Sequence, residues 1–248
     1  MTPILMVTIL GVKIDNISKS ECLNKIREFL QSQNQHYIVT PNPEFLVAAQ
    51  KDNEFKKILN DADLSIADGV GLKFGSFFKI KHRITGADLM FDICKLAEQN
   101  MYSVYLVGGK QDIAKRTAYK LKEKFSDLKI SGWQDGMEAQ NTDVEKIKNA
   151  NPDILFVAFG QVKQEKWIYE NLKRIPSAKL AMGVGGAFDY ISGEIKRSPY
   201  VFRIIGLEWL YRLVKEPKRI KRIYNAIIRF PFYVILNLVL SVPKDNQN

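Results

Sequence analysis

Acidic and polar side chains follow several short apolar runs of the sequence, at positions where strands would end. Asp68 comes directly after the run Leu64–Ala67 and is followed by Gly69. A carboxylate at a strand end can project into a cleft, and the glycine lets the backbone approach a ligand closely. Such a carboxylate suits general-base chemistry, in which it takes a proton from an attacking hydroxyl. From the residues alone, a helix N-cap is an equal alternative for Asp68.

A second polar cluster has the sequence Thr40-Pro-Asn42-Pro-Glu44. Its two prolines favour an extended turn just before a helix. In such a turn Thr40 and Asn42 would offer compact hydrogen-bonding groups to a ligand. The simpler alternative is turn chemistry in which Asn42 only caps the following helix.

Glycines mark a third candidate segment, Gly183-Val-Gly185-Gly186-Ala-Phe-Asp189, which follows a hydrophobic run. Backbone N–H groups of such a turn can hold a diphosphate, and Asp189 could accept a hydrogen bond from a sugar or ribose hydroxyl. Close packing of the backbone is the structural alternative. After a different run, Gln164 and Glu165 begin a predicted helix, where they would bind a base or sugar or only complement the helix dipole.

The acidic and histidine residues do not predict a metal site. Asp61-Ala-Asp63 has a spacing that holds a divalent metal in many glycosyltransferases, but it precedes a predicted strand and lies away from the expected cleft. His36 and His82 lack metal-ligand spacing. We therefore expect neither a metal nor another cofactor.

The elements that must position these residues form an α/β pattern up to about Ser198. Continuous apolar runs separated by amphipathic helices predict a Rossmann-like, mostly parallel sheet with helices on both faces. In such folds ligands bind beyond the carboxyl ends of the strands. The predicted strands are Val7–Val12, Tyr37–Thr40, Leu64–Ala67, Ser103–Val107, Leu128–Ser131, Ile154–Ala158 and Leu180–Val184. The predicted helices include Lys19–Ser32, Asn53–Asp61, Gly86–Gln99, Lys110–Phe125 and Gln164–Leu172.

Positive charge is concentrated near the end of the chain. The whole sequence has 37 Lys and Arg against 27 Asp and Glu, and from Tyr200 onward nine basic residues face only three acidic ones. This change of character predicts an α/β core over residues 1–198 and a C-terminal helical, basic and aromatic appendage over residues 199–248. Arg212, Arg219 and Arg222 share one face of a helix there. Basic residues interleaved with aromatic ones suit an anionic membrane surface.

Two further features bear on location. Phe230–Val242 is thirteen residues without a charge, whereas about 20 are needed to cross a bilayer, so we expect it to lie in the membrane interface or cover a core. Apolar surface left uncovered there would favour a homo-oligomer. Cys22 and Cys94 lie in amphipathic stretches and are expected to be buried, reduced thiols, as suits a cytoplasmic protein.

The ordered set of motifs resembles the WecG/TagA/CpsF glycosyltransferases over essentially the whole chain. Besides the segments above, the resemblance rests on Arg83-Ile-Thr-Gly-Ala-Asp88, Lys196-Arg-Ser-Pro199 and Gly206-Leu-Glu-Trp-Leu-Tyr-Arg212. One departure is visible, because the family's Gly-x-Pro-x-Gln-Glu pattern here reads Gly160-Gln-Val162-Lys-Gln164-Glu165.

The resemblance implies an inverting, metal-independent transfer of N-acetylmannosamine from its UDP donor to undecaprenyl-diphosphate-N-acetylglucosamine. It makes Asp68 the expected base, places Thr40, Asn42 and Arg83 in the active-site pocket, and assigns Gln164, Gly185, Gly186 and Asp189 to substrate binding. It further implies that the appendage closes over the site at the cytoplasmic face of the membrane. The three arginines facing the diphosphate would then be Arg212, Arg219 and Arg222.

Three alternatives stay open on the sequence. The first is the same family with a different UDP-hexose donor. The second is a nicotinamide- or flavin-dependent oxidoreductase, against which Val107-Gly-Gly109 lacks the full dinucleotide fingerprint. The third is a non-catalytic module that binds a membrane or a nucleic acid, which would leave the polar motifs after separate strands unexplained; we expect no nucleic-acid partner.

Overall fold

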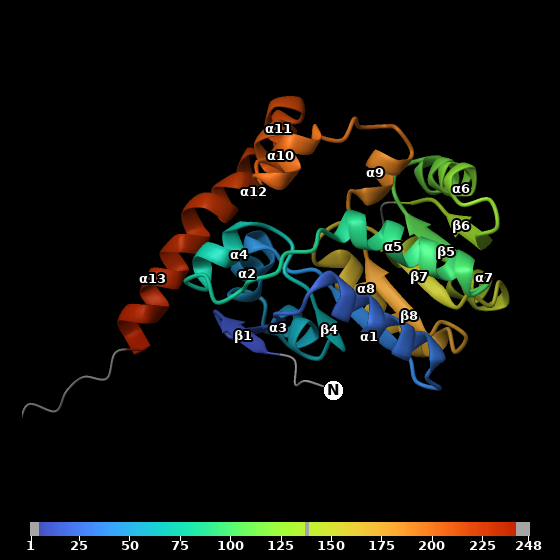
Figure 1. Ribbon diagram of the computed structural model, residues 1–248, viewed down its shortest axis with the longest axis horizontal. Helices are drawn as coiled ribbons and strands as arrows, with labels where there is room; N and C mark the ends of the chain where they lie inside the picture. The colour runs from blue at the N-terminus through green and yellow to red at the C-terminus, as the bar shows by residue number, and fades with distance from the viewer. Residues whose placement is uncertain (1–4, 137–138, 242–248) are drawn as a thin grey trace, which may run out of the picture.

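The computed structural model describes residues 5–136 and 139–241, without the side chains of Arg203, Ile204, Arg212, Lys218 and Ser241. Its centre is a six-stranded, wholly parallel sheet in the order β4-β3-β8-β7-β5-β6 (Figure 1). The strands are β3 (His36–Val39), β4 (Leu64–Ser65), β5 (Ser103–Gly108), β6 (Lys129–Gln134), β7 (Ile154–Ala158) and β8 (Leu180–Gly183). The predicted α/β class and the six predicted strands of this sheet are confirmed.

Helices cover both faces of the sheet, and each face has its own apolar core. On one face pack α1 (Lys19–Gln31), α5 (Gly86–Gln99), α6 (Ile113–Lys124) and α9 (Ala187–Ile191). The other face is covered by α2 (Pro43–Ala49), α3 (Asn53–Asn60), α7 (Val144–Asn149) and α8 (Lys163–Asn171). Strands buried on both sides read as continuous apolar runs, which is why the sequence predicts them well.

The prediction of one buried strand over Val7–Val12 is wrong. This segment forms an antiparallel hairpin of β1 (Met6–Ile9) and β2 (Val12–Asp15), outside the main sheet. Leu10 and Gly11 make the turn with φ of 52° and 76°. Buried and exposed residues alternate along β1, as expected for strands that cover a core with one face and meet solvent with the other.

Short helices and turns complete the core. They are α4 (Gly71–Gly75), η1 (Ala139–Asn141) and η2 (Leu172–Arg174). Cys22 and Cys94 are buried free thiols, as predicted.

The described part of the C-terminal region is mostly helical. It consists of α10 (Tyr200–Ile204), α11 (Glu208–Lys215), η3 (Pro217–Arg219), α12 (Ile220–Tyr224), the π-helical turn η4 (Asn225–Arg229) and α13 (Phe230–Ser241). The helix from Ile220 to Leu240 projects along one side of the molecule (Figure 1). Phe230 and Val234 are buried in the same core as the hairpin residues, so this region is fixed to the core by packing.

By length and composition alone, residues 220–240 could cross a membrane. Their mean hydropathy is 1.6 over the most apolar window, and only 11% of that window is buried. The uncharged part alone is shorter, because α13 has twelve residues and an α-helix of that length extends about 18 Å.

Candidate active site

One pocket of about 380 Å³ opens at the carboxyl ends of the strands. Its floor comes from the turns after β3, β4, β7 and β8, and its far wall from residues between Gly206 and Ile227. A parallel sheet brings the turns after its strands to one edge, so residues far apart in the sequence meet there. The pocket therefore lies between the predicted core and the predicted appendage.

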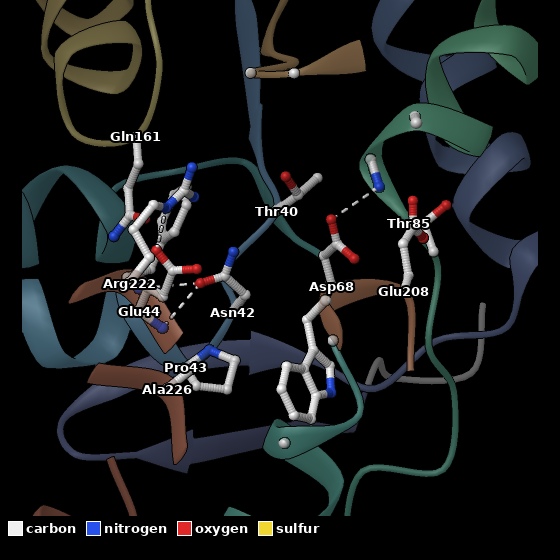
Figure 2. Close-up of a pocket in the computed structure, with 18 of the residues that line it drawn as sticks. Thr40, Asn42, Pro43, Glu44, Asp68, Thr85, Gln161, Glu208, Arg222 and Ala226 are labelled. Carbon is white, nitrogen blue, oxygen red and sulfur yellow. Dashed lines mark hydrogen bonds and ion pairs between the residues drawn. The ribbon is translucent and has the colours of Figure 1, made fainter. Parts of the chain in front are cut away.

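Asp68 lies half-buried in the floor of the pocket, just after β4 (Figure 2). Its Oδ2 accepts a hydrogen bond from the backbone N–H of Gly86 at 3.1 Å. Burial raises the pKa of Asp68 to about 6, the negative charge of Glu208 adds to the rise, and the Gly86 hydrogen bond and Arg83 oppose it. A carboxylate with this pKa is ionised near neutral pH and still basic enough to accept a proton.

Thr40 and Asn42 line the same pocket, in the turn between β3 and α2. Asn42 caps α2, because its Oδ1 accepts from the N–H groups of Glu44 at 2.9 Å and Phe45 at 3.2 Å. The capping alternative is therefore realised, and the same residue also faces the pocket. Thr40 is 7% exposed and, in Figure 2, lies across from Asp68.

The glycine turn after β8 is held from beneath by two buried side chains at the start of α8. Gln164 Oε1 accepts from the N–H of Gly185 at 2.9 Å, and Gln164 Nε2 donates to Glu165 Oε1 at 2.6 Å. A Cβ at Gly183 would lie 2.5 Å from Gln164 Nε2, so only glycine allows this approach. Gln164 thus lines the pocket and also positions the turn that contains Gly185 and Gly186.

Glu165 is buried and completes this network. Its Oε2 accepts from the N–H of Val162 at 2.8 Å, and burial raises the pKa of the Glu165 carboxyl to about 7. Val162 has φ of 72°, an angle that proline cannot adopt. The residue that departs from the family pattern thus has a backbone conformation that proline could not adopt, and it supplies an N–H group that proline lacks.

Arg197 is a pocket residue that the sequence did not single out. Its Nη1 pairs with Asp88 Oδ1 at 2.8 Å, and Asp88 Oδ2 in turn accepts from Thr85 Oγ1 at 2.6 Å at the start of α5. The Nε and Nη2 atoms of Arg197 are buried and have no hydrogen-bond partner among the residues that the structure describes. Buried donors of this kind are costly unless a ligand satisfies them.

The C-terminal region closes the other side of the pocket. Arg222 Nε pairs with Glu44 Oε2 at 2.6 Å, which ties α12 to α2 (Figure 2). Arg219 pairs with Glu216 and also lines the pocket, together with Glu208 and Trp209. Of the three predicted arginines, Arg219 and Arg222 are thus brought to the site; Arg212 lies in α11, and its side chain is outside the described part of the structure.

Asp189 and the pair Asp61 and Asp63 do not line the pocket. Asp189 is in α9 and is not among the residues that line the pocket, so its predicted hydrogen bond to a sugar or ribose is left without support. Asp63 accepts from the N–H of Tyr37 at 3.0 Å, at the amino end of β3, and Asp61 pairs with Lys57. Among the described residues there is no group of three or more His, Cys, Asp or Glu that could hold a metal ion.

The sequence also gave no indication of Glu44 and Glu208 as wall residues. Glu44 stands in the motif that was singled out, but its partner Arg222 comes from the far end of the chain. Only the fold shows that these charges meet, and neither periodicity nor local spacing contains that information.

Fold and pocket together define an α/β protein whose cleft offers a basic carboxylate, a backbone turn rich in glycine and several guanidinium groups. Such a cleft suits a ligand with hydroxyl and phosphate groups. The chain belongs to the WecG/TagA/CpsF family of glycosyl transferases, whose model matches residues 7–242.

Several similar proteins of this family come from Staphylococcus aureus. In strains MW2, MRSA252 and NCTC 8325 the relative is an N-acetylglucosaminyldiphosphoundecaprenol N-acetyl-beta-D-mannosaminyltransferase. Each is 34% identical over 228 residues, which cover 90% of this chain and 89% of the relative. The resemblance seen in the sequence is therefore confirmed at the level of the family.

Proposed function

We propose that this glycosyltransferase moves N-acetylmannosamine from UDP-N-acetylmannosamine to a polyprenyl-diphosphate-linked N-acetylglucosamine, with inversion. The family supports a UDP-sugar donor and a lipid-linked acceptor, and the names of the staphylococcal relatives support this donor sugar. The observation that carries the proposal is Asp68, a carboxylate of raised pKa in the cleft where core and C-terminal region meet.

The proposed reaction is a single displacement. Asp68 takes the proton from the acceptor hydroxyl as its oxygen attacks the anomeric carbon, and UDP leaves from the opposite face. The bond to the acceptor oxygen forms as the bond to the UDP oxygen breaks, and the proton ends on Asp68. The Gly86 N–H group holds Oδ2 in place, so Oδ1 is the oxygen left to act as base.

Negative charge that develops on the leaving UDP must be met by fixed donors. The turn after β8 offers the N–H group of Gly186, because that of Gly185 already donates to Gln164, and the guanidinium group of Arg197 is a second candidate. Arg197 is fixed by Asp88, so it meets the diphosphate without first having to be ordered. Arg219 and Arg222 add positive charge from the opposite wall.

We also propose that the protein works at the cytoplasmic face of the membrane as a peripheral enzyme. Exposed apolar side chains on α13, among them Phe232, Ile235 and Val239, support contact with lipid. The ion pair of Arg222 with Glu44 keeps the start of the long helix at the pocket. Within the long helix, the part without charged residues is α13, which is about 18 Å long. This length is short for a bilayer, so a position in the membrane interface is favoured over a helix that crosses the membrane.

The test is a transfer assay on the full chain, with UDP-N-acetylmannosamine and a short-chain polyprenyl-diphosphate-N-acetylglucosamine as substrates. We expect UDP release that depends on the acceptor and a disaccharide product with a β-linkage. UDP release without acceptor at the same rate would contradict a transferase. Release with another UDP-hexose and none with UDP-N-acetylmannosamine would keep the reaction and change the donor, which is the second candidate.

A further inference from the structure

Three phenylalanines of the α/β part of the chain are exposed to solvent on the segment that follows β4: Phe74, Phe77 and Phe78. Their exposed fractions are 59%, 59% and 58%. Large apolar side chains grouped in this way on a surface mark a contact with another molecule or with a membrane. None of the three lines the pocket, so catalysis does not explain their exposure.

The backbone of this segment is fixed in the shape that exposes the rings. Phe77 and Phe78 both have left-handed backbones, with φ of 51° and 61°. The N–H of Phe78 donates to the carbonyl of Lys73 at 2.7 Å, and Ser76 Oγ donates to the same carbonyl at 2.9 Å. Consecutive bulky residues rarely adopt this conformation, so the turn is strained. The result is that the aromatic rings lie on the surface.

This turn is locked to the C-terminal helix. A Cβ at Gly75 would lie 2.3 Å from Cζ of Phe230, so α4 and α13 touch at a position where only glycine fits. Figure 1 shows α4 beside the long helix at that point. The exposed residues of α13 continue beyond Phe230 and include Phe232, Ile235 and Leu236. The aromatic turn and α13 therefore belong to one rigid part of the surface.

Charge identifies the partner. The segment from Gly71 to His82 contains Lys73, Lys79 and Lys81 and no acidic residue, and α13 contains no charged residue. Aromatic rings flanked by lysines suit the interface of an anionic membrane, where rings enter the head-group region and ammonium groups stay at the phosphates.

We infer that Phe74, Phe77 and Phe78 form a second membrane-inserting element, supplied by the catalytic core and acting together with α13. Two contacts fix the orientation of the enzyme on the bilayer, whereas a single helix would leave it free to rotate about its attachment. The inference rests on the membrane location proposed above, and it does not depend on the identity of the transferred sugar.

The test compares binding of the full chain to phosphatidylcholine vesicles with and without phosphatidylglycerol, for wild type and for Phe74→Ser/Phe77→Ser/Phe78→Ser. We expect the variant to lose about tenfold or more in partition to the anionic vesicles, because three rings no longer enter the interface. Tyr119→Ser removes a ring that is 56% exposed on α6 and should leave partition unchanged. UDP binding in solution reports that the variants are folded.

Partition of the triple variant equal to that of wild type would overturn the inference. So would a wild-type dimer in solution that becomes monomeric in the variant while vesicle binding stays the same, since the rings would then be a contact between copies. Should the triple variant fail to fold, Phe78→Trp with brominated lipids replaces it: we expect quenching beyond that of wild type, and Tyr119→Trp serves as the control. No added quenching would equally overturn the inference. Transfer to a short-chain acceptor tests the proposed function separately.

Discussion

At the scale of single residues, the environment of Asp68 determines how activity should depend on pH. A general base works only when ionised, and burial raises the pKa of Asp68 to about 6. We expect kcat/KM to be level above about pH 7 and to fall about tenfold per pH unit below pH 6. Initial rates of UDP release across this range check the prediction; a rate independent of pH down to pH 5 would contradict it.

The raised pKa of Asp68 makes the stability of the fold change with pH in the opposite direction to activity. The carboxyl has a pKa of 3.8 when unfolded and about 6 when folded, so the folded state holds this proton more tightly. Ionisation of Asp68 therefore costs stability as the pH rises from about 4 to about 6. Asp68 is maintained at some cost to the fold, as expected for a functional carboxylate.

Arg197 gives the second prediction at this scale. If its unsatisfied Nε and Nη2 atoms meet a diphosphate, Arg197→Gln should weaken UDP binding about tenfold or more and leave uridine binding unchanged. Calorimetry with the two ligands checks this. Arg116→Gln is a matched control, because Arg116 forms an exposed ion pair with Glu194 and does not line the pocket. Equal losses for UDP and uridine would mean that Arg197 only supports the fold.

Some residues of the site could be predicted from the sequence, and others could not. Asp68, Thr40, Asn42 and the glycine turn were predictable, because each directly follows an apolar strand. Arg197 lies in the motif Lys196–Pro199, but the motif does not indicate what Arg197 does. Its partner Asp88 lies in another element, and an orphaned donor is visible only once burial is known.

At the scale of elements, the packing of α13 on the core makes the next prediction. Phe230 is 2% exposed and packs against Gly75, whereas Phe232 is 60% exposed on the same helix. We expect Phe230→Ala to cost about 3 kcal/mol of unfolding free energy and Phe232→Ala to stay within about 0.5 kcal/mol. Urea denaturation of both variants provides the comparison. Equal effects would show that α13 does not pack on the core in solution.

Elements differ in how far local pattern determines them. The strands of the parallel sheet were predicted within a few residues, since burial on both faces leaves an unbroken apolar run. The segment Val7–Val12 is predicted as one strand because it is almost entirely apolar, whereas its turn depends on a positive φ at Leu10 that no sequence pattern signals. Whether 198 is the true boundary of a domain stays a prediction, although Phe230 joins the core.

At the scale of the whole molecule, the pocket requires both parts of the chain. Residues after 199 supply Glu208, Trp209, Arg219 and Arg222 to its wall and two side chains to the core. We therefore expect a chain ending at Pro199 to fold with lower stability, to lose transfer, to bind vesicles more weakly because only the aromatic turn of the core remains, and to retain weakened UDP binding. Circular dichroism, the transfer assay and vesicle sedimentation check the three parts. Full transfer by the truncated chain would contradict a role of this region in catalysis.

Asp68→Asn tests whether Asp68 is the base of an acceptor-dependent transfer. Asparagine keeps the shape and the acceptor for the Gly86 N–H group, and it removes the desolvated charge, so the variant should be at least as stable as wild type at neutral pH. The measurement is kcat for transfer beside the Kd for UDP. We predict a loss of about 10²- to 10⁴-fold in kcat with UDP affinity within about twofold of wild type. Wild-type kcat in the variant would show that Asp68 is not the base.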